Sequence, residues 1–187
     1  MTKHTTALWW IRRDLRLADN QALAAAESAA DIVVPVFVID PHLMEANRSS
    51  IVRVSFLLAG LRQLDRDLQR HRSRLIVRHG KVATALADLA GEAGATAIFA
   101  EEDYSPYARR RDAEICRCLP LHLVPGLTVH PPQAVVKADG SPYTVFTPYC
   151  RAWKSLPLPG PTRRESLPRL APPPEVSSLP LPDAAAP

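Results

Sequence analysis

The sequence predicts an α/β fold: a doubly wound, five-stranded parallel sheet with helices on both faces, followed by a Pro-rich C-terminal tail. Three observations support this prediction. Short apolar runs alternate with helical patterns about four times, the links between them are short, and several runs are rich in β-branched residues. Such alternation is typical of βαβ units, whose crossovers place helices on the two faces of a parallel sheet.

The five expected strands are largely continuous apolar runs, which indicates that both faces of the sheet are covered. They lie at residues 7–11, 32–39, 74–78, 97–100 and 121–124. Pro35 falls inside the second run. Because proline donates no ladder hydrogen bond, it argues against a fully central strand at that point.

Helices are expected at about 20–30, from a cap at Ser49 or Ser50 to about residue 68, at 82–93 and at 107–118. The second is the clearest, because its leucines recur at helical spacing with charged residues between them. Asp19 stands where the N-cap of the first helix belongs. Gly94 is a candidate for a left-handed cap at the end of the third.

The totals are those of one ordinary globular domain: 187 residues, 47% hydrophobic, with a formal net charge of +4. No apolar run approaches the ~20 residues that cross a bilayer, and no signal peptide is recognisable, so no membrane contact and a cytoplasmic location are expected. The positive charge is spread along the chain without interleaved aromatic residues, which does not favour direct nucleic-acid binding by this region alone.

Metal binding is not expected either. The three cysteines, Cys116, Cys118 and Cys150, lack zinc-ligand spacing, and the six histidines are scattered. Free, reduced thiols are the expectation.

From residue 156 onward the composition changes, and ten of the last 32 residues are proline. This composition predicts an extended, mobile linker rather than helix or sheet.

Charged residues follow three of the apolar runs, at the edge of the sheet where open α/β folds bind ligands. They are Arg12-Arg13-Asp14, then Asp40, then Glu101-Glu102-Asp103. Two interpretations remain open: a polar-rimmed crevice, or the ordinary polarity of strand ends. No glycine-rich phosphate loop and no persuasive Ser-His-Asp order are present, so no catalytic residue is assigned.

The segment Trp10-Ile11-Arg12-Arg13-Asp14-Leu15-Arg16-Leu17-Ala18-Asp19-Asn20 resembles the opening of the DNA photolyase/cryptochrome family. Residues 37–41, 53–58 and 143–153 resemble further segments of the same family, so the resemblance covers about residues 7–155.

The resemblance implies a Rossmann-like, antenna-binding domain of a deoxyribodipyrimidine photolyase at residues 1–135, and an interdomain connection with the Pro-rich linker at 136–187. In the family, a helical domain holds FAD and meets UV-damaged DNA. This sequence stops before that domain, so we expect the chain alone to be catalytically inactive.

Residues 103–112, DYSPYARRRD, are similar to the stretch of family members that use an 8-hydroxy-deazaflavin antenna. Folate and FMN are the alternatives. Carried over residue by residue, the resemblance implies a chromophore site made by Arg12, Phe37, Val38, Asp40, Arg53, Asp103 and Arg111. Phe37 and Val38 would wall a planar ring, and the charged residues would meet its polar edge and hydroxyl chain. Arg53 and Arg111 could instead be ordinary helix-surface charges.

Three other functions are alternatives. A cryptochrome-type photoreceptor fragment would share this domain. A stand-alone nucleotide-binding module of the universal-stress type would need a glycine-rich loop where the carboxylates of residues 101–103 stand, and these would repel phosphate. A non-functional truncation would expose apolar surface near Tyr149 and Trp153 and self-associate.

Overall fold

The computed structural model describes residues 4–44, 50–158, 170 and 175–182. It contains one five-stranded sheet whose paired strands are all parallel, in the order β3-β2-β1-β4-β5. The strands are β1 (His4–Ile11), β2 (Ala30–Ile39), β3 (Ile76–His79), β4 (Ala97–Glu101) and β5 (Leu121–Val124). The expected doubly wound α/β fold is confirmed.

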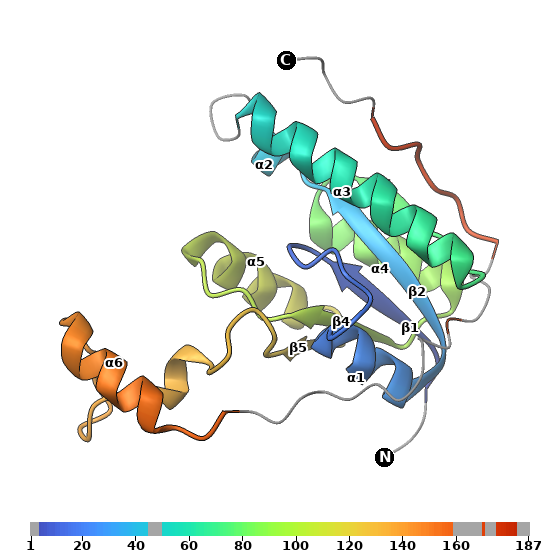
Figure 1. The fold of residues 1–187 in the computed structure, drawn as a ribbon. Helices are drawn as coiled ribbons and strands as arrows, with labels where there is room; N and C mark the ends of the chain where they lie inside the picture. The colour runs from blue at the N-terminus through green and yellow to red at the C-terminus, as the bar shows by residue number, and fades with distance from the viewer. Residues whose placement is uncertain (1–3, 45–49, 159–169, 171–174, 183–187) are drawn as a thin grey trace.

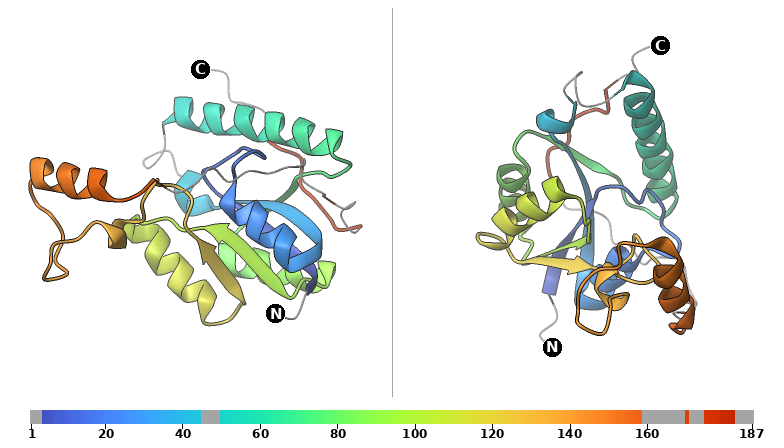
Figure 2. Two further views of the ribbon diagram at one scale, coloured as in Figure 1. Left: turned by 60° about the horizontal axis from the view of Figure 1, so that its bottom comes forward. Right: turned by 90° about the vertical axis from the view of Figure 1, so that its left-hand side faces the viewer.

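Helices cover both faces of this sheet (Figures 1 and 2). Helices α1 (Gln21–Ala29) and α3 (Ile51–Arg70) pack on one face; α4 (Val82–Ala93) and α5 (Pro106–Cys116) pack on the other. Because side chains alternate along a strand, neighbouring tryptophans serve different cores: Trp9 faces α1 and α3, and Trp10 faces α4 and α5. Both are almost fully buried, as expected.

Two of the three expected helix caps are confirmed. The side chain of Ser50 caps α3, and Gly94 ends α4 in the left-handed region with φ 62°. The third expectation was wrong by one residue: the side chain of Asn20, not Asp19, accepts from the Leu23 amide at 2.8 Å. Asp19 instead has φ 52°, a left-handed conformation that aspartate tolerates better than most residues and that turns the chain into the helix.

Pro35 lies in β2 although β2 has a neighbour on each side. It stands opposite Trp9 in the pairing with β1, but the pairing with β3 begins only at Val36. The proline therefore lies just outside the second ladder.

Beyond the sheet, the chain forms three elements that the sequence interpretation did not specify: α2 (Pro41–Met44), the short helix η1 (Pro132–Ala134) and α6 (Phe146–Ser155). Helix α6 projects away from the sheet in Figure 1 and in the left-hand view of Figure 2, and it has no buried residue. No helix within the described ranges is long and apolar enough to span a bilayer.

Residues 170 and 175–182 of the tail pack on the body, so the expected mobile linker is not observed for these residues; residues 159–169, 171–174 and 183–187 lie outside the described part of the chain. Its residues 175–182 are extended and run beside β3. The Val77 amide donates to Ser178 Oγ at 3.0 Å, and the Leu179 amide donates to the Val77 carbonyl at 3.0 Å. Val176 is 7% exposed and joins the α4-side core. The tail thus satisfies polar groups of an edge strand that would otherwise face solvent.

Candidate functional site at the strand ends

The strand order reverses between β1 and β4, so the loops that follow these two strands diverge to opposite sides of the sheet. This divergence leaves a crevice at the carboxyl ends of the strands, where open α/β sheets bind ligands. The crevice is bordered by the ends of β1 and β2, by the loop after β4 and by the first two turns of α5.

An inner cavity of about 330 Å³ occupies this crevice. Six of the seven residues that the sequence singled out line it: Arg12, Phe37, Val38, Asp40, Asp103 and Arg111. The other lining residues are Trp10, Ile11, Arg13, Val82, Ser105, Tyr107 and Ala108. Phe37 and Val38 point to opposite faces of the sheet, so the cavity lies across the strand end.

Arg53 is the exception. It lies in the first turn of α3, is exposed to solvent, and is not among the residues that line this cavity.

Two arginines in the wall of the inner cavity share one carboxylate. Arg12 Nη1 donates to both oxygens of Asp112, at 2.9 and 2.6 Å, and Arg111 Nη2 donates to Asp112 Oδ1 at 3.0 Å. Both guanidinium carbons lie 4.7 Å from the centre of the Trp10 ring, a distance at which a cation and an aromatic ring attract. The cluster leaves one positive charge in excess beside the cavity.

Arg12 is the less solvated of the two arginines. Its side chain is 6% exposed, and its Nε and Nη2 atoms are buried without a hydrogen-bond partner in the described structure. Burial lowers the pKa of the Arg12 guanidinium, and Asp112 opposes this effect through its charge and hydrogen bonds. Buried N–H groups without partners are costly, and Arg12 lines the cavity, so the site is suited to a ligand that reaches the guanidinium and accepts hydrogen bonds.

Asp103 supplies negative charge to the lining of the cavity. Burial works to raise the pKa of this carboxyl, but hydrogen bonds from Ser105 and the charges of Arg13 and Arg12 outweigh burial, so the pKa lies below its usual value. The Ser105 amide donates to Asp103 Oδ1 at 2.9 Å, and Arg13 Nη1 lies 3.7 Å from Oδ2. Asp103 is therefore a fixed, ionised acceptor.

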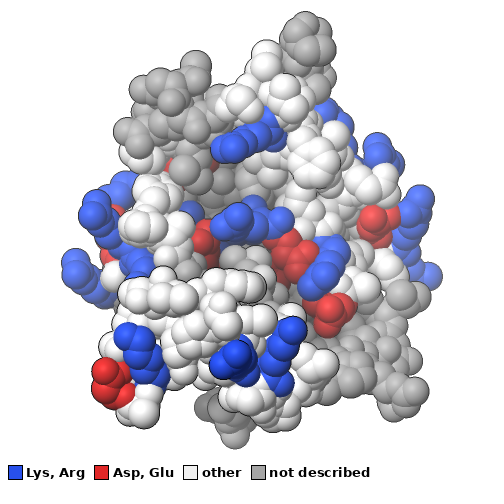
Figure 3. All heavy atoms as spheres, turned by 60° about the vertical axis from the view of Figure 1, so that its left-hand side comes forward, with Lys and Arg blue, Asp and Glu red and all other residues white. Residues whose placement is uncertain are grey.

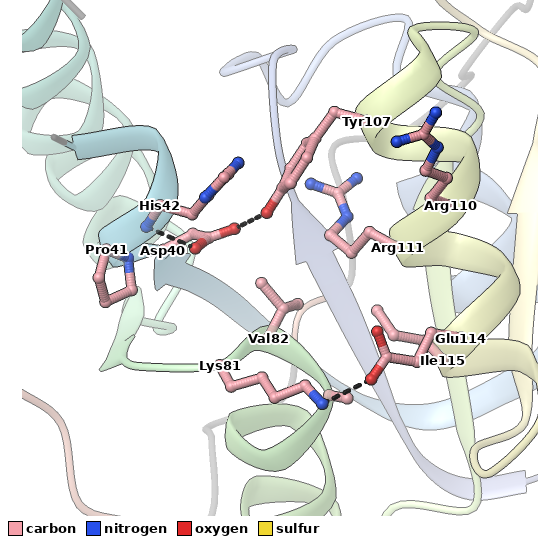
Figure 4. Close-up of a pocket in the computed structure, with 11 residues that line it drawn as sticks. Asp40, Pro41, His42, Lys81, Val82, Tyr107, Arg110, Arg111, Glu114 and Ile115 are labelled. Atoms are coloured by element: carbon pink, nitrogen blue, oxygen red, sulfur yellow. Dashed lines mark hydrogen bonds and ion pairs between the residues drawn. The ribbon is translucent and has the colours of Figure 1, made fainter. Parts of the chain in front are cut away.

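A second cavity of about 450 Å³ adjoins the first and is shown in Figure 4. It lies between the start of α2, the start of α4 and the outer side of α5, and Lys81 and Glu114 form an ion pair at 2.5 Å in its wall. We call it the outer lobe and the first cavity the inner lobe.

Tyr107 and Asp40 meet between the two lobes. The Tyr107 hydroxyl donates to Asp40 Oδ2, and the His42 amide donates to Oδ1 at 3.0 Å. The His42 ring stacks on the Tyr107 ring with centroids 4.9 Å apart.

Sequence reasoning missed Trp10, Tyr107 and Asp112 as parts of this site. Tyr107 and Asp112 lie in segment 103–112, whose resemblance to deazaflavin-using family members could have pointed to both residues. Nothing local to Trp10 distinguishes it from Trp9.

A third hollow of about 620 Å³ lies on the other side of the loops after β1 and β4. Its lining is mostly charged or polar, and only Tyr104 and Leu127 add an aromatic ring and a large aliphatic side chain, fewer apolar groups than line the inner lobe. A planar organic ligand therefore fits the crevice better than this hollow. Within the described residues, no group of three or more His, Cys, Asp or Glu side chains could hold a metal ion.

Comparisons with known proteins show which family the chain belongs to. The model of the DNA photolyase family matches residues 7–173. The deoxyribodipyrimidine photo-lyase of Streptomyces griseus is 38% identical over 91% of this chain and 38% of its own length. The chain spans between 33% and 63% of the length of three curated relatives that it matches.

Two solved structures are also similar. A bacterial class III photolyase from Agrobacterium tumefaciens has a TM-score of 0.80 and 26% identity, over 97% of this chain and 38% of that one. An archaeal photolyase from Sulfolobus tokodaii has a TM-score of 0.58 and 34% identity, over 64% of this chain and 28% of that one. With its parallel sheet and its match over most of its length, the chain belongs to the DNA photolyase/cryptochrome family and corresponds to the amino-terminal α/β domain of that family.

Proposed function

We propose that the crevice at the strand ends binds a light-harvesting antenna chromophore of the 8-hydroxy-deazaflavin type. The observation that carries this proposal is the state of Arg12, whose side chain is 6% exposed and lies in the wall of the inner lobe, and two of whose nitrogens have no hydrogen-bond partner among the described residues. A ring carbonyl or ring nitrogen of a flavin-like chromophore would accept hydrogen bonds from these atoms.

The remaining walls fit the same chemistry. Phe37 and Val38 supply apolar surface for a planar ring, and Arg111 and Asp103 supply a donor and an acceptor for polar substituents. A bound chromophore would supply absorption of blue light, and the residues of this chain would orient its ring and exclude water from it. We retain Arg53 as a candidate contact for the outermost part of a ligand chain.

The choice among antennas remains a proposal, with folate and FMN as alternatives. The Sulfolobus tokodaii photolyase contains two FAD molecules, which imply a novel light-harvesting cofactor in that protein. This supports a flavin-type ligand in the family more directly than a folate.

We further propose that the whole protein is a light-driven DNA-repair photolyase, since the relatives named above are photolyases. In this proposal the crevice gathers light, and catalysis belongs to a helical FAD-binding domain of the family that also meets UV-damaged DNA. In this proposal, no residue of the α/β domain takes part in the repair reaction. On the face shown in Figure 3, Lys and Arg are interspersed with Asp and Glu across the middle, an arrangement that does not favour DNA binding by that face.

Residues 136–187 would connect the two domains, and α6 is the proposed contact surface. Val145 and Phe146 are 60% and 76% exposed, and Tyr149 lies one turn further along the same helix. Exposed aromatic residues of this density are typical of a surface that another domain covers.

The direct test is a titration of the purified chain with 8-hydroxy-deazaflavin, FMN and methenyl-tetrahydrofolate, followed by absorption and fluorescence spectroscopy. We expect saturable binding of the deazaflavin. Arg12→Lys keeps the charge but removes the guanidinium donors, and should weaken binding at least tenfold. Arg109→Lys, an exposed position on α5, is the matched control and should bind as the wild type does. No bound absorption with any of the three compounds at saturating concentration would refute the proposal.

A further inference from the structure

The two lobes of the crevice have four lining residues in common: Asp40, Val82, Tyr107 and Arg111. These side chains therefore form the partition between them. The inner lobe reaches the ends of β1 and β2, whereas the outer lobe opens between α2, α4 and α5 (Figure 4).

Polar contacts across the partition are made by Tyr107. Its hydroxyl, from α5, donates to the Asp40 carboxylate at the end of β2, as the dashed line in Figure 4 marks. Its ring is in contact with two neighbours: the His42 ring stacks on it at an interplanar angle of 15°, and the Arg111 guanidinium carbon lies 5.5 Å from its centre. The ring is thus held in place by packing, and the hydroxyl joins two elements that no backbone ladder connects.

The volume of the inner lobe gives a reason for the importance of the contact between Tyr107 and Asp40. Ligand pockets usually measure about 300 to 1,000 Å³, so the inner lobe alone, at about 330 Å³, is at the lower limit. A tricyclic ring with a hydroxylated chain needs the inner lobe for its ring and the outer lobe for its chain. The chain of such a ligand would have to cross the partition where the Tyr107 hydroxyl meets Asp40.

We propose that Tyr107 is a latch: its hydrogen bond to Asp40 closes the partition in the free protein and must break for a ring-and-chain chromophore to occupy both lobes. This inference rests on the proposed function of the crevice. It assigns Tyr107 to control of chromophore entry, and it predicts that the Tyr107 hydroxyl and the Asp40 carboxylate separate when the chromophore binds.

The variant that tests the latch is Tyr107→Phe, which removes the hydroxyl and keeps the ring against His42. Stopped-flow fluorescence with 8-hydroxy-deazaflavin should then show an association rate about tenfold higher than that of the wild type, because the closed state no longer has a charge-assisted hydrogen bond to break. Tyr104→Phe is the matched control. Tyr104 precedes α5 and lines the third hollow rather than either lobe. Loss of the Tyr104 hydroxyl should therefore leave the association rate unchanged.

A second measurement does not depend on the ligand. In Tyr107→Phe, hydrogen exchange at the first turn of α5 should be faster than in the wild type, because this turn loses its tie to β2. Equal exchange in the two proteins would overturn the latch even if no compound binds.

The outcomes separate the two proposals. Binding to both proteins with equal association rates overturns the latch and leaves the antenna site intact. Absence of binding to either protein, with faster exchange in the variant, refutes the antenna site and supports the contact as a closure of the crevice.

Discussion

Glu101, the last residue of β4, allows a prediction about pH and stability. It is 5% exposed, and its pKa is raised from 4.5 to about 8. Burial is the largest cause, followed by the charge of Asp14 and a hydrogen bond with Asp14, and the positive charges of Arg16 and Arg12 oppose them only in part. The Oε1 atom has no hydrogen-bond partner in the described structure. At neutral pH the folded protein therefore holds a proton on this side chain.

The sign of the effect on stability follows from proton counting. Between pH 4.5 and about 8 the folded chain keeps the Glu101 proton and the unfolded chain has released it, so the free energy of unfolding falls as the pH rises. Each pH unit costs up to about 1.4 kcal/mol, and the whole interval costs at most about 5 kcal/mol. Because the loop that carries Asp14 can relax and admit water, we expect a measured loss of about 2 to 3 kcal/mol.

Glu101→Gln is the perturbation that tests this account, because glutamine keeps the shape and stays neutral. Urea unfolding at pH 5, 6, 7, 8 and 9 should show a smaller decline in stability for the variant than for the wild type, and the two curves should separate most at pH 8 to 9. Asp88→Asn, at an exposed position of α4, is the control and should follow the wild-type curve. Parallel curves for the wild type and Glu101→Gln would refute the reasoning.

Four further variants test the packing and the cap of α4. Asp112→Asn should lower the free energy of unfolding by about 3 kcal/mol in urea, because it leaves the Arg12 guanidinium buried beside a neutral partner; a loss below about 1 kcal/mol would mean that the guanidinium reaches water. Val176→Ala should cost about 2 kcal/mol in a thermal or urea melt, since Val176 ties the tail to the core; wild-type stability would place the tail free in solution. Gly94→Ala should destabilise by about 1 kcal/mol because its φ is 62°, whereas Gly91→Ala, within α4, should stabilise by about 0.5 kcal/mol; effects of the same sign would contradict the assignment of the cap.

Helix α6 was not expected, although its segment of the sequence carries a helical pattern. Phe146, Tyr149, Cys150 and Trp153 recur at helical spacing within α6. The segment was interpreted only through its resemblance to a connection between domains. Its helix has no buried residue, so packing on the described body gives it little support.

The tail shows the opposite case. Its prolines do exclude regular structure, and the described residues are extended. Composition does not reveal that Val77 at the edge of the sheet offers an N–H and a carbonyl to this segment, because the two lie about 100 residues apart. Attachment rather than mobility is thus a property of the folded chain.

By itself, the sequence determined the order and type of the main elements, because strand and helix periodicity depend on residues a few positions apart. It also placed charges at the strand ends, since parallel strands bring their carboxyl ends to one edge. Only the tertiary structure decided which charges meet. Arg12 and Asp112 are 100 residues apart, and Tyr107 and Asp40 are 67 apart. The crossover connections decide such pairings, and burial of the resulting clusters then sets their charge states, as it does for Glu101.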